Sequence, residues 1–123
     1  MVIYVSSPYK AVLNAVNDSA EAKSLIIGYA IEGAQIIKEM GYTPLSPVLN
    51  FEGVYEEESE REVILKAGLE LLKVCDGILI VNTPYSDTSA GMVLELESAK
   101  RLNLALYETL LDEKGGINEI KKL

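Results

Sequence analysis

Two glutamates stand among apolar residues in the segment 89–97, SAGMVLELE. A carboxylate in an apolar environment can serve as a nucleophile or as a general acid or base, because its surroundings alter its affinity for a proton. An α-helix advances about 100° per residue, so the place of each glutamate on a helix over residues 89–102 decides whether it meets solvent or the core. Helical geometry therefore separates the two carboxylates.

Glu95 falls on the apolar side of this predicted helix and Glu97 on the polar side. The apolar arc, about 120° wide, also contains Met92, Leu96, Ala99 and Leu102. Glu97 shares the opposite side with Lys100 and Arg101, so we expect it to be exposed and able to pair with one of them. An unpaired carboxylate is costly to bury, which favours a functional role for Glu95 over a buried structural glutamate.

The start of the same helix, Ser89 to Gly91, is a second candidate for chemistry. Free backbone N–H groups and the helix dipole can hold an anion such as a phosphate there. Gly91 would let a ligand approach the backbone closely. An ordinary N-cap serine explains Ser89 equally well, and both interpretations stay open.

The composition excludes several catalytic arrangements. The 123 residues include no histidine and one cysteine, Cys75, so Cys/His zinc sites, His-based catalytic dyads and an internal disulfide are ruled out. We expect Cys75 to be a small core residue. The acidic run Glu56–Glu62 is interpreted as a solvated loop and helix start, and we expect neither a metal ion nor a cofactor.

The net charge of -8 argues against nucleic acids and anionic membranes as partners. No apolar run reaches the roughly 18 residues needed to cross a bilayer, and the amino terminus lacks a signal-peptide pattern. We therefore expect a cytoplasmic protein whose ligand is a small molecule.

Strand and helix patterns alternate along the chain. We predict strands at 2–5, 42–45, 76–82 and 104–107, helices at 18–40, 59–73 and 89–102, a long loop at 46–58 and a short amphipathic end. Asp18 with Glu21 and Ser59 with Glu62 resemble capping boxes, and Gly41 is a natural helix stop.

This alternation predicts an α/β fold formed by a single domain over residues 1–123. We expect a small doubly wound, flavodoxin- or Rossmann-like parallel sheet of four to five strands with helices on both faces. Ligands of such folds bind outside the carboxyl ends of the strands. The loops 6–10, 46–58 and 82–91 should therefore border the ligand.

Three segments in this order resemble the nucleoside 2-deoxyribosyltransferase superfamily, which includes 2'-deoxynucleoside 5'-phosphate N-hydrolases. They are IYVSSPY at 3–9, CDGILIV at 75–81 and SAGMVLELESAKRLN at 89–103, the last with a G-x-x-x-E-x-x-x-A spacing. The resemblance implies that Glu95 is the nucleophile. It would attack the anomeric carbon, release the base and form a glycosyl ester that water or a second base resolves, as in retaining glycosidases.

The resemblance also implies a substrate site. Ser6, Ser7 and Tyr9 would line the sugar and base site, and Ser89 would help to hold a 5'-phosphate. Tyr9 can stack on a base or be an ordinary loop tyrosine. In the third loop, Asn82, Asp87 and Gly91 are the further candidates for substrate binding.

One position departs from the superfamily pattern. Many members carry an aspartate eight residues before the leading aspartate of the third strand, and here that position is Gly68. Asp76, Asp87 or Glu70 can supply a second carboxylate, and we take Asp76 with Glu95 as the catalytic candidates. Asp76 is equally well interpreted as a turn residue at the strand start.

Two functions follow as hypotheses. The first is an enzyme, a nucleoside deoxyribosyltransferase or nucleotide N-glycoside hydrolase, which cleaves or exchanges the N-glycosidic bond of a (deoxy)nucleoside or its 5'-monophosphate. The alternative is a non-catalytic nucleotide-binding or sensing module on the same fold. We also expect a homodimer or higher homo-oligomer, because Val93 and Leu94 are surplus apolar surface on their helix.

Overall fold

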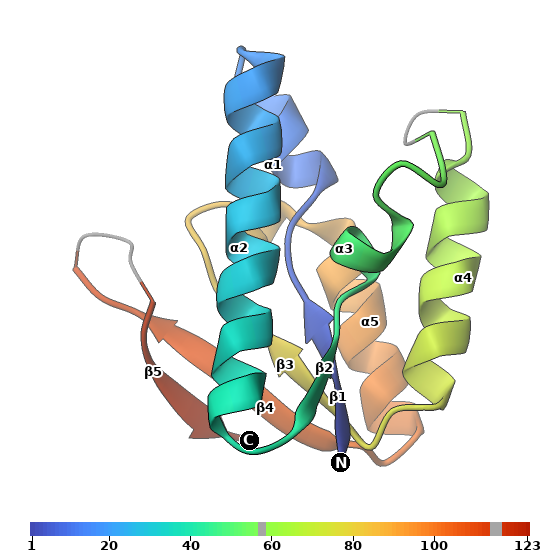
Figure 1. Ribbon diagram of the computed structural model, residues 1–123, viewed down its shortest axis with the longest axis vertical. Helices are drawn as coiled ribbons and strands as arrows, with labels where there is room; N and C mark the ends of the chain where they lie inside the picture. The colour runs from blue at the N-terminus through green and yellow to red at the C-terminus, as the bar shows by residue number, and fades with distance from the viewer. Residues whose placement is uncertain (57–58, 114–116) are drawn as a thin grey trace.

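Five strands form one sheet in the order β2-β1-β3-β4-β5 (Figure 1). The computed structural model describes residues 1–56, 59–113 and 117–123. The strands are β1 (Val2–Ser6), β2 (Thr43–Leu45), β3 (Gly77–Ile80), β4 (Ala105–Leu111) and β5 (Ile117–Lys122). The first four are parallel and β5 is antiparallel to β4. The predicted α/β fold is confirmed, with an antiparallel strand added at one edge.

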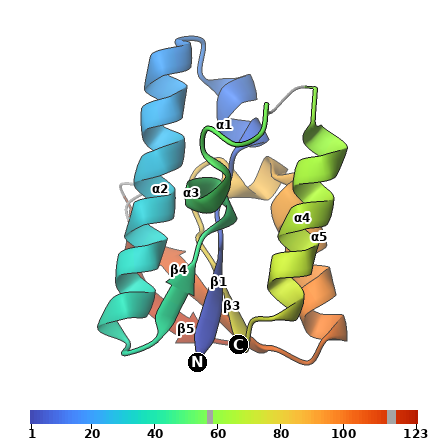
Figure 2. The ribbon, with the colours of Figure 1, turned by 45° about the vertical axis from the view of Figure 1, so that its right-hand side comes forward.

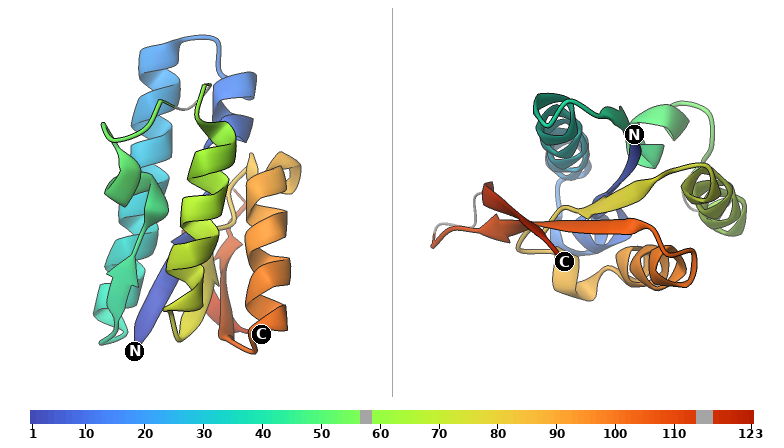
Figure 3. Two further views of the ribbon diagram at one scale, coloured as in Figure 1. Left: turned by 90° about the vertical axis from the view of Figure 1, so that its right-hand side faces the viewer. Right: turned by 90° about the horizontal axis from the view of Figure 1, so that it is seen from below.

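Helices cover both faces of the sheet. They are α1 (Lys10–Ala15), α2 (Ser19–Glu39), α3 (Pro47–Phe51), α4 (Arg61–Lys73) and α5 (Ala90–Arg101), with a 3-10 turn, η1, at Ser86–Thr88. Figure 3 shows α2 on one side of the sheet and α5 on the other. In the described part of the chain, no helix is long and apolar enough to cross a membrane.

Alternate residues of the strands supply the cores on the two faces of the sheet. Ile3 and Val5 of β1 pack with Ile37 on the side of α2, whereas Tyr4 packs with Leu72 and other residues on the side of α4 and α5. This follows from the period of two along a strand. Cys75 is buried in the second core, as predicted.

The ends of α2 follow the predicted signals. The carboxylate of Asp18 accepts hydrogen bonds from the N–H groups of Ala20 and Glu21, and Gly41 ends the helix with a φ of 86°. In the middle of the helix, Gly33 allows close contact with the sheet. A Cβ there would lie 2.6 Å from a methyl group of Val5.

Two predictions about the middle of the chain were wrong. Segment 46–58 was expected to be a loop, but it contains α3, because Pro47 is preorganised for a first turn and Ser46 caps it by accepting from Leu49 N–H at 3.2 Å. Residues 57–58 of that expected loop lie outside the described part. The Ser59 capping box also does not form, because α4 begins later, after Glu60.

The end of the chain is also different from the prediction. An amphipathic end was expected after 104–107, but the chain turns back and pairs as β5 along β4. The unpaired N–H and C=O groups at the edge of β4 favour pairing with the segment that follows it along the chain. Similarly, α1 is a short helix that the sequence pattern did not reveal.

The strand order reverses between β1 and β3, whose neighbours lie on opposite sides in the sheet. Doubly wound sheets bind ligands at the carboxyl ends of the strands beside this switch point. The amino terminus of β1 lies at the opposite end of the sheet (Figure 1). Figure 2 shows α3 between α2 and α4, near the carboxyl end of β1. These elements surround the site described next.

Candidate active site

Glu95 on α5 reaches the carboxyl end of β1. Its Oε2 accepts a hydrogen bond from the hydroxyl of Tyr4, and its Oε1 accepts one from Ser6 Oγ at 2.9 Å. Tyr4 and Ser6 are fully buried alternate residues of β1, so both side chains face α5. Two hydroxyl groups from one strand therefore hold the two oxygens of the carboxylate.

The surroundings of Glu95 raise its pKa to about 7. Burial is the main cause, because it disfavours the charged form. The hydrogen bonds from Tyr4 and Ser6 and the charge of Arg61 act in the opposite direction and lower the pKa. Burial and the nearby charge of Glu95 raise the pKa of Tyr4, so its hydroxyl keeps its proton and remains a donor. Glu95 can thus change its ionisation near neutral pH.

A pocket lies at the carboxyl end of the sheet and includes Glu95 in its wall. β1, α2, α3, α4 and α5 all contribute residues to it. Each of the three loops predicted to border the ligand also contributes, through Ser7 and Tyr9, through Glu52 and through Ser89. The predicted position of the cleft is therefore confirmed.

Gly68 on α4 also lies in this wall. A Cβ built at Gly68 would lie 3.0 Å from the hydroxyl oxygen of Tyr4. The tyrosine hydroxyl therefore occupies space that a side chain at position 68 would need. Among the described residues of the wall, the carboxylate other than that of Glu95 belongs to Glu52, which follows α3.

The start of α5 forms another part of the wall. Ser89 is the N-cap, and its Oγ accepts a hydrogen bond from Met92 N–H at 3.4 Å, so the capping interpretation of Ser89 holds. Ser89 and Gly91 both line the pocket. A Cβ at Gly91 would lie 3.3 Å from a guanidinium nitrogen of Arg61, the first residue of α4. Gly91 thus allows Arg61 to lie against α5.

Ser7 brings an unsatisfied polar group to the pocket. The residue is 8% exposed, and its Oγ has no hydrogen-bond partner among the described residues. Buried hydroxyl groups in folded proteins nearly always have a partner. A ligand in the pocket could supply one, because Ser7 is part of the pocket wall.

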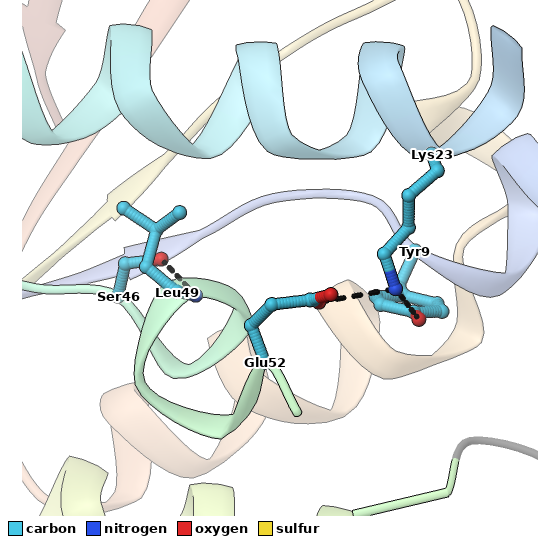
Figure 4. A network of polar contacts seen from close by, with 5 residues as sticks. All are labelled: Tyr9, Lys23, Ser46, Leu49 and Glu52. Atoms are coloured by element: carbon cyan, nitrogen blue, oxygen red, sulfur yellow. Dashed lines mark hydrogen bonds and ion pairs between the residues drawn. The ribbon is translucent and has the colours of Figure 1, made fainter. Parts of the chain in front are cut away.

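Tyr9, Lys23 and Glu52 form a polar network at the pocket (Figure 4). The ammonium group of Lys23 donates to the Tyr9 hydroxyl at 3.1 Å and lies 3.0 Å from a carboxylate oxygen of Glu52. Both contacts raise the pKa of Lys23, and the hydrogen bond to Tyr9 has the larger effect. The network links the first loop, α2 and the end of α3.

A family model described as a domain of unknown function, DUF7768, matches residues 1–109. The chain belongs to the DUF7768 family. No curated protein matches the sequence. Among solved structures, the DUF7768 chain is similar to the 2-deoxyribosyltransferase of the psychrotolerant bacterium Bacillus psychrosaccharolyticus. The TM-score is 0.61 and the identity 23%, over 86% of this chain and 69% of the other. The two proteins share a fold.

Asp76 is not part of the pocket of the DUF7768 chain. It precedes β3, at the amino ends of the parallel strands, whereas the pocket lies at their carboxyl ends. Its carboxylate accepts a hydrogen bond from the N–H of Val2 at 2.7 Å. The structure therefore places Asp76 apart from Glu95 and agrees with its alternative interpretation as a strand-start residue.

Asn82 and Asp87 also lie apart from Glu95, in a separate shallow hollow beside the end of β4. The Asn82 side chain donates to the backbone carbonyl of Thr109 at 2.7 Å and to the carboxylate of Glu108 at 3.2 Å. It joins β4 to the loop after β3. Neither Asn82 nor Asp87 lines the pocket of Glu95, because this part of the loop 82–91 lies beside the end of β4.

The predictions of exposed residues on α5 are confirmed for Glu97 and Val93 but not for Leu94. Glu97 is exposed, as predicted, but Arg101 donates to Ser98 at 3.3 Å, and within the described residues Glu97 forms no ion pair. Val93 is 51% exposed, whereas Leu94, also predicted as surplus surface, is half-buried in the pocket wall.

Among the residues of the site that sequence reasoning missed are Tyr4, which binds Glu95, and three charged residues, Arg61, Lys23 and Glu52. Tyr4 was assigned to a core strand, and Arg61 was counted within a solvated acidic run. Lys23 lies on α2 and Glu52 follows α3. The two side chains meet only because the fold brings these helices together. Only Tyr4 had a usable signal, since it is two residues before Ser6 and must face the same side of the sheet.

Proposed function

We propose that the DUF7768 chain cleaves or exchanges the N-glycosidic bond of a deoxynucleoside or its 5'-monophosphate, with Glu95 as the nucleophile. The observation that carries this proposal is the carboxylate of Glu95 in a pocket wall, held by the hydroxyl groups of Tyr4 and Ser6. The fold shared with the Bacillus psychrosaccharolyticus 2-deoxyribosyltransferase supports it.

The reaction has two displacements at one carbon. A Glu95 oxygen attacks the anomeric carbon, the bond to the base nitrogen breaks with its electron pair, and the base takes a proton from water. Water or a second base then attacks the same carbon, gives up a proton to the hydroxide left by the first step, and releases the Glu95 carboxylate. Two inversions give net retention, as in retaining glycosidases. Tyr4 and Ser6 orient the carboxylate through both steps.

The rest of the pocket suits a nucleoside. Tyr9, Phe51 and Tyr55 are aromatic residues of its wall, and the Phe51 and Tyr55 rings meet edge to face with centroids 5.2 Å apart. Aromatic side chains favour contact with a flat base. The amino end of α5 and the unsatisfied Ser7 hydroxyl provide donors for the sugar or a 5'-phosphate.

A panel of nucleosides tests the proposal. Purified chain is incubated with the four common deoxynucleosides and with their 5'-monophosphates, with and without a second free base, and products are separated by chromatography. We expect release or exchange of a base that Glu95→Ala abolishes and Glu97→Gln retains. A folded chain that acts on no member of the panel would refute the proposal.

A second function is favoured by Gly68. The pocket wall has no carboxylate at this position, and the Tyr4 hydroxyl lies there instead. We therefore also propose a non-catalytic nucleotide-binding module as the alternative. Calorimetry that detects nucleotide binding without any turnover would support this alternative over the enzyme, and absence of binding to every nucleotide would reject it.

A further inference from the structure

Four charged side chains lie in the described wall of the pocket, two cations and two acids. They are Lys23, Glu52, Arg61 and Glu95. Lys23 and Glu52 are bound to each other, with nitrogen and oxygen 3.0 Å apart. The other two belong to neighbouring helices, Arg61 to α4 and Glu95 to α5. Arg61 and Glu95 therefore lie on the same side of the pocket.

The contact between Arg61 and Gly91 sets how close these two charges come. A guanidinium nitrogen of Arg61 would be 3.3 Å from a Cβ at position 91, so the missing side chain leaves room for the guanidinium. Gly91 and Glu95 are four residues apart and lie on the same face of α5, about 6 Å apart along its axis. Arg61 thus lies against the helix one turn before the carboxylate.

We propose that Arg61, packed against Gly91, is a positioning residue that keeps the Glu95 carboxylate ionised for attack. This inference rests on the proposed function. In this proposal Gly91 makes space for the guanidinium of Arg61, whereas the sequence suggested that it makes space for a ligand. Arg61 itself lies in the pocket wall, although its neighbours in the sequence form an acidic run.

Burial opposes the ionisation of Glu95, and three groups that face the carboxylate act in the other direction. From β1 come the hydrogen bonds of Tyr4 and Ser6, which lower its pKa most but bring no positive charge. From α4 comes Arg61, whose charge lowers the pKa of Glu95. Lys23 and Glu52 complete the charged groups of the wall and largely cancel each other. A protonated carboxyl has no charge with which to attack the anomeric carbon.

The ionisation of Glu95 can be measured without any substrate. The chain is labelled with 13C at the glutamate side-chain carboxyl carbons, and the signal absent from Glu95→Gln is followed from pH 4 to 10 by NMR. Arg61→Gln removes the charge and Arg61→Lys retains it. Lys66→Gln is the matched control, because Lys66 is an exposed cation on the same helix outside the pocket wall.

We expect Glu95 to titrate at higher pH in Arg61→Gln than in the unmodified chain, with Arg61→Lys between the two and Lys66→Gln unchanged. Gly91→Ala, which displaces the guanidinium, should shift the titration in the same direction, and it tests the proposal even if Arg61→Gln does not fold. In the enzyme assay, Arg61→Gln should lower kcat/KM about threefold to tenfold at pH 6 and less than twofold at pH 9.

Two results would overturn the proposal. One is a Glu95 titration that Arg61→Gln and Gly91→Ala leave unchanged in folded protein. The other is an equal shift in Lys66→Gln, which would show a general effect of net charge. The expected titration shifts in a chain that acts on no nucleoside would instead reject the proposed function, while the effect of Arg61 on Glu95 stands.

Discussion

The hydroxyl of Tyr4 donates a hydrogen bond to Oε2 of Glu95 and joins β1 to α5 across 91 positions of the sequence. The same hydroxyl lies where a side chain at position 68 would point. A tyrosine hydroxyl is neutral and donates, whereas a second carboxylate would repel the first. The carboxylate of Glu95 is therefore held by two neutral donors, the hydroxyl groups of Tyr4 and Ser6.

Tyr4→Phe removes one of these donors and leaves the ring in place. Since the hydrogen bond from Tyr4 lowers the pKa of Glu95, we expect its loss to raise that pKa and to move the acidic limb of kcat/KM to higher pH. The expected loss at pH 6 is about tenfold, the worth of one hydrogen bond to a charged group. A pH profile measured on base release checks this.

Ser6→Ala is the companion variant. It removes the donor to Oε1, and it should shift the profile in the same direction as Tyr4→Phe. Circular dichroism on both variants distinguishes a shifted profile from a loss of folded protein. An unchanged acidic limb in two folded variants would show that these hydroxyl groups do not control the ionisation of Glu95.

The raised pKa of Glu95 also predicts how stability depends on pH. The folded-state pKa, about 7, lies above the ordinary value of 4.5, so the folded chain binds this proton more tightly than the unfolded chain. The contribution of Glu95 to the free energy of unfolding is therefore greatest below pH 4.5 and falls as the pH rises to 7.

Glu95→Gln removes this dependence because an amide does not titrate. Relative to the unmodified chain, we expect the variant to gain as much as about 3 kcal/mol of unfolding free energy between pH 4 and pH 8. Urea denaturation at several pH values measures the difference. Glu97→Gln, at an exposed position, should show no such trend. A constant difference between Glu95→Gln and the unmodified chain would contradict the raised pKa.

Gly68 and Gly28 form a matched pair for the packing of Tyr4. Gly28→Ala on α2 meets no atom within 4 Å, so the helix preference of alanine should raise the unfolding free energy by about 0.5–1 kcal/mol. Gly68→Ala should be about 1–2 kcal/mol less favourable, because its methyl group meets the Tyr4 hydroxyl. Thermal or urea denaturation measures both. In a Tyr4→Phe background the two alanines should become alike, and a persistent difference there would argue against this contact.

The sequence was sufficient to predict the parallel strands of the sheet and the inward position of Glu95, because both depend on local periodicity. Alternation of strands and helices gives a doubly wound sheet, and a helical wheel separates Glu95 from Glu97. The choice of Asp76 had a different origin. It was selected to replace the carboxylate missing at position 68, although a residue that begins a parallel strand lies at the amino end of the sheet, away from the ligand-binding end.

The missed residues depend on contacts distant in the sequence. Arg61 belongs to the site because α4 packs beside α5, and Lys23 and Glu52 meet because α3 lies against α2. The strand β5 is a local case, because it follows β4 directly and pairs with its free edge. None of these contacts has a period in the sequence, so composition and spacing alone did not predict them.

The most direct test of the central claim is to trap the glycosyl ester on Glu95. Nucleosides that carry fluorine at the 2'-position form the oxocarbenium-like transition state reluctantly and slow the breakdown of the ester, so mass spectrometry can detect it. We predict that the chain gains the mass of one fluorinated sugar, that the gain maps to the peptide containing Glu95, and that Glu95→Gln gains none. Release of base by the folded chain with no adduct at Glu95 would contradict the claim.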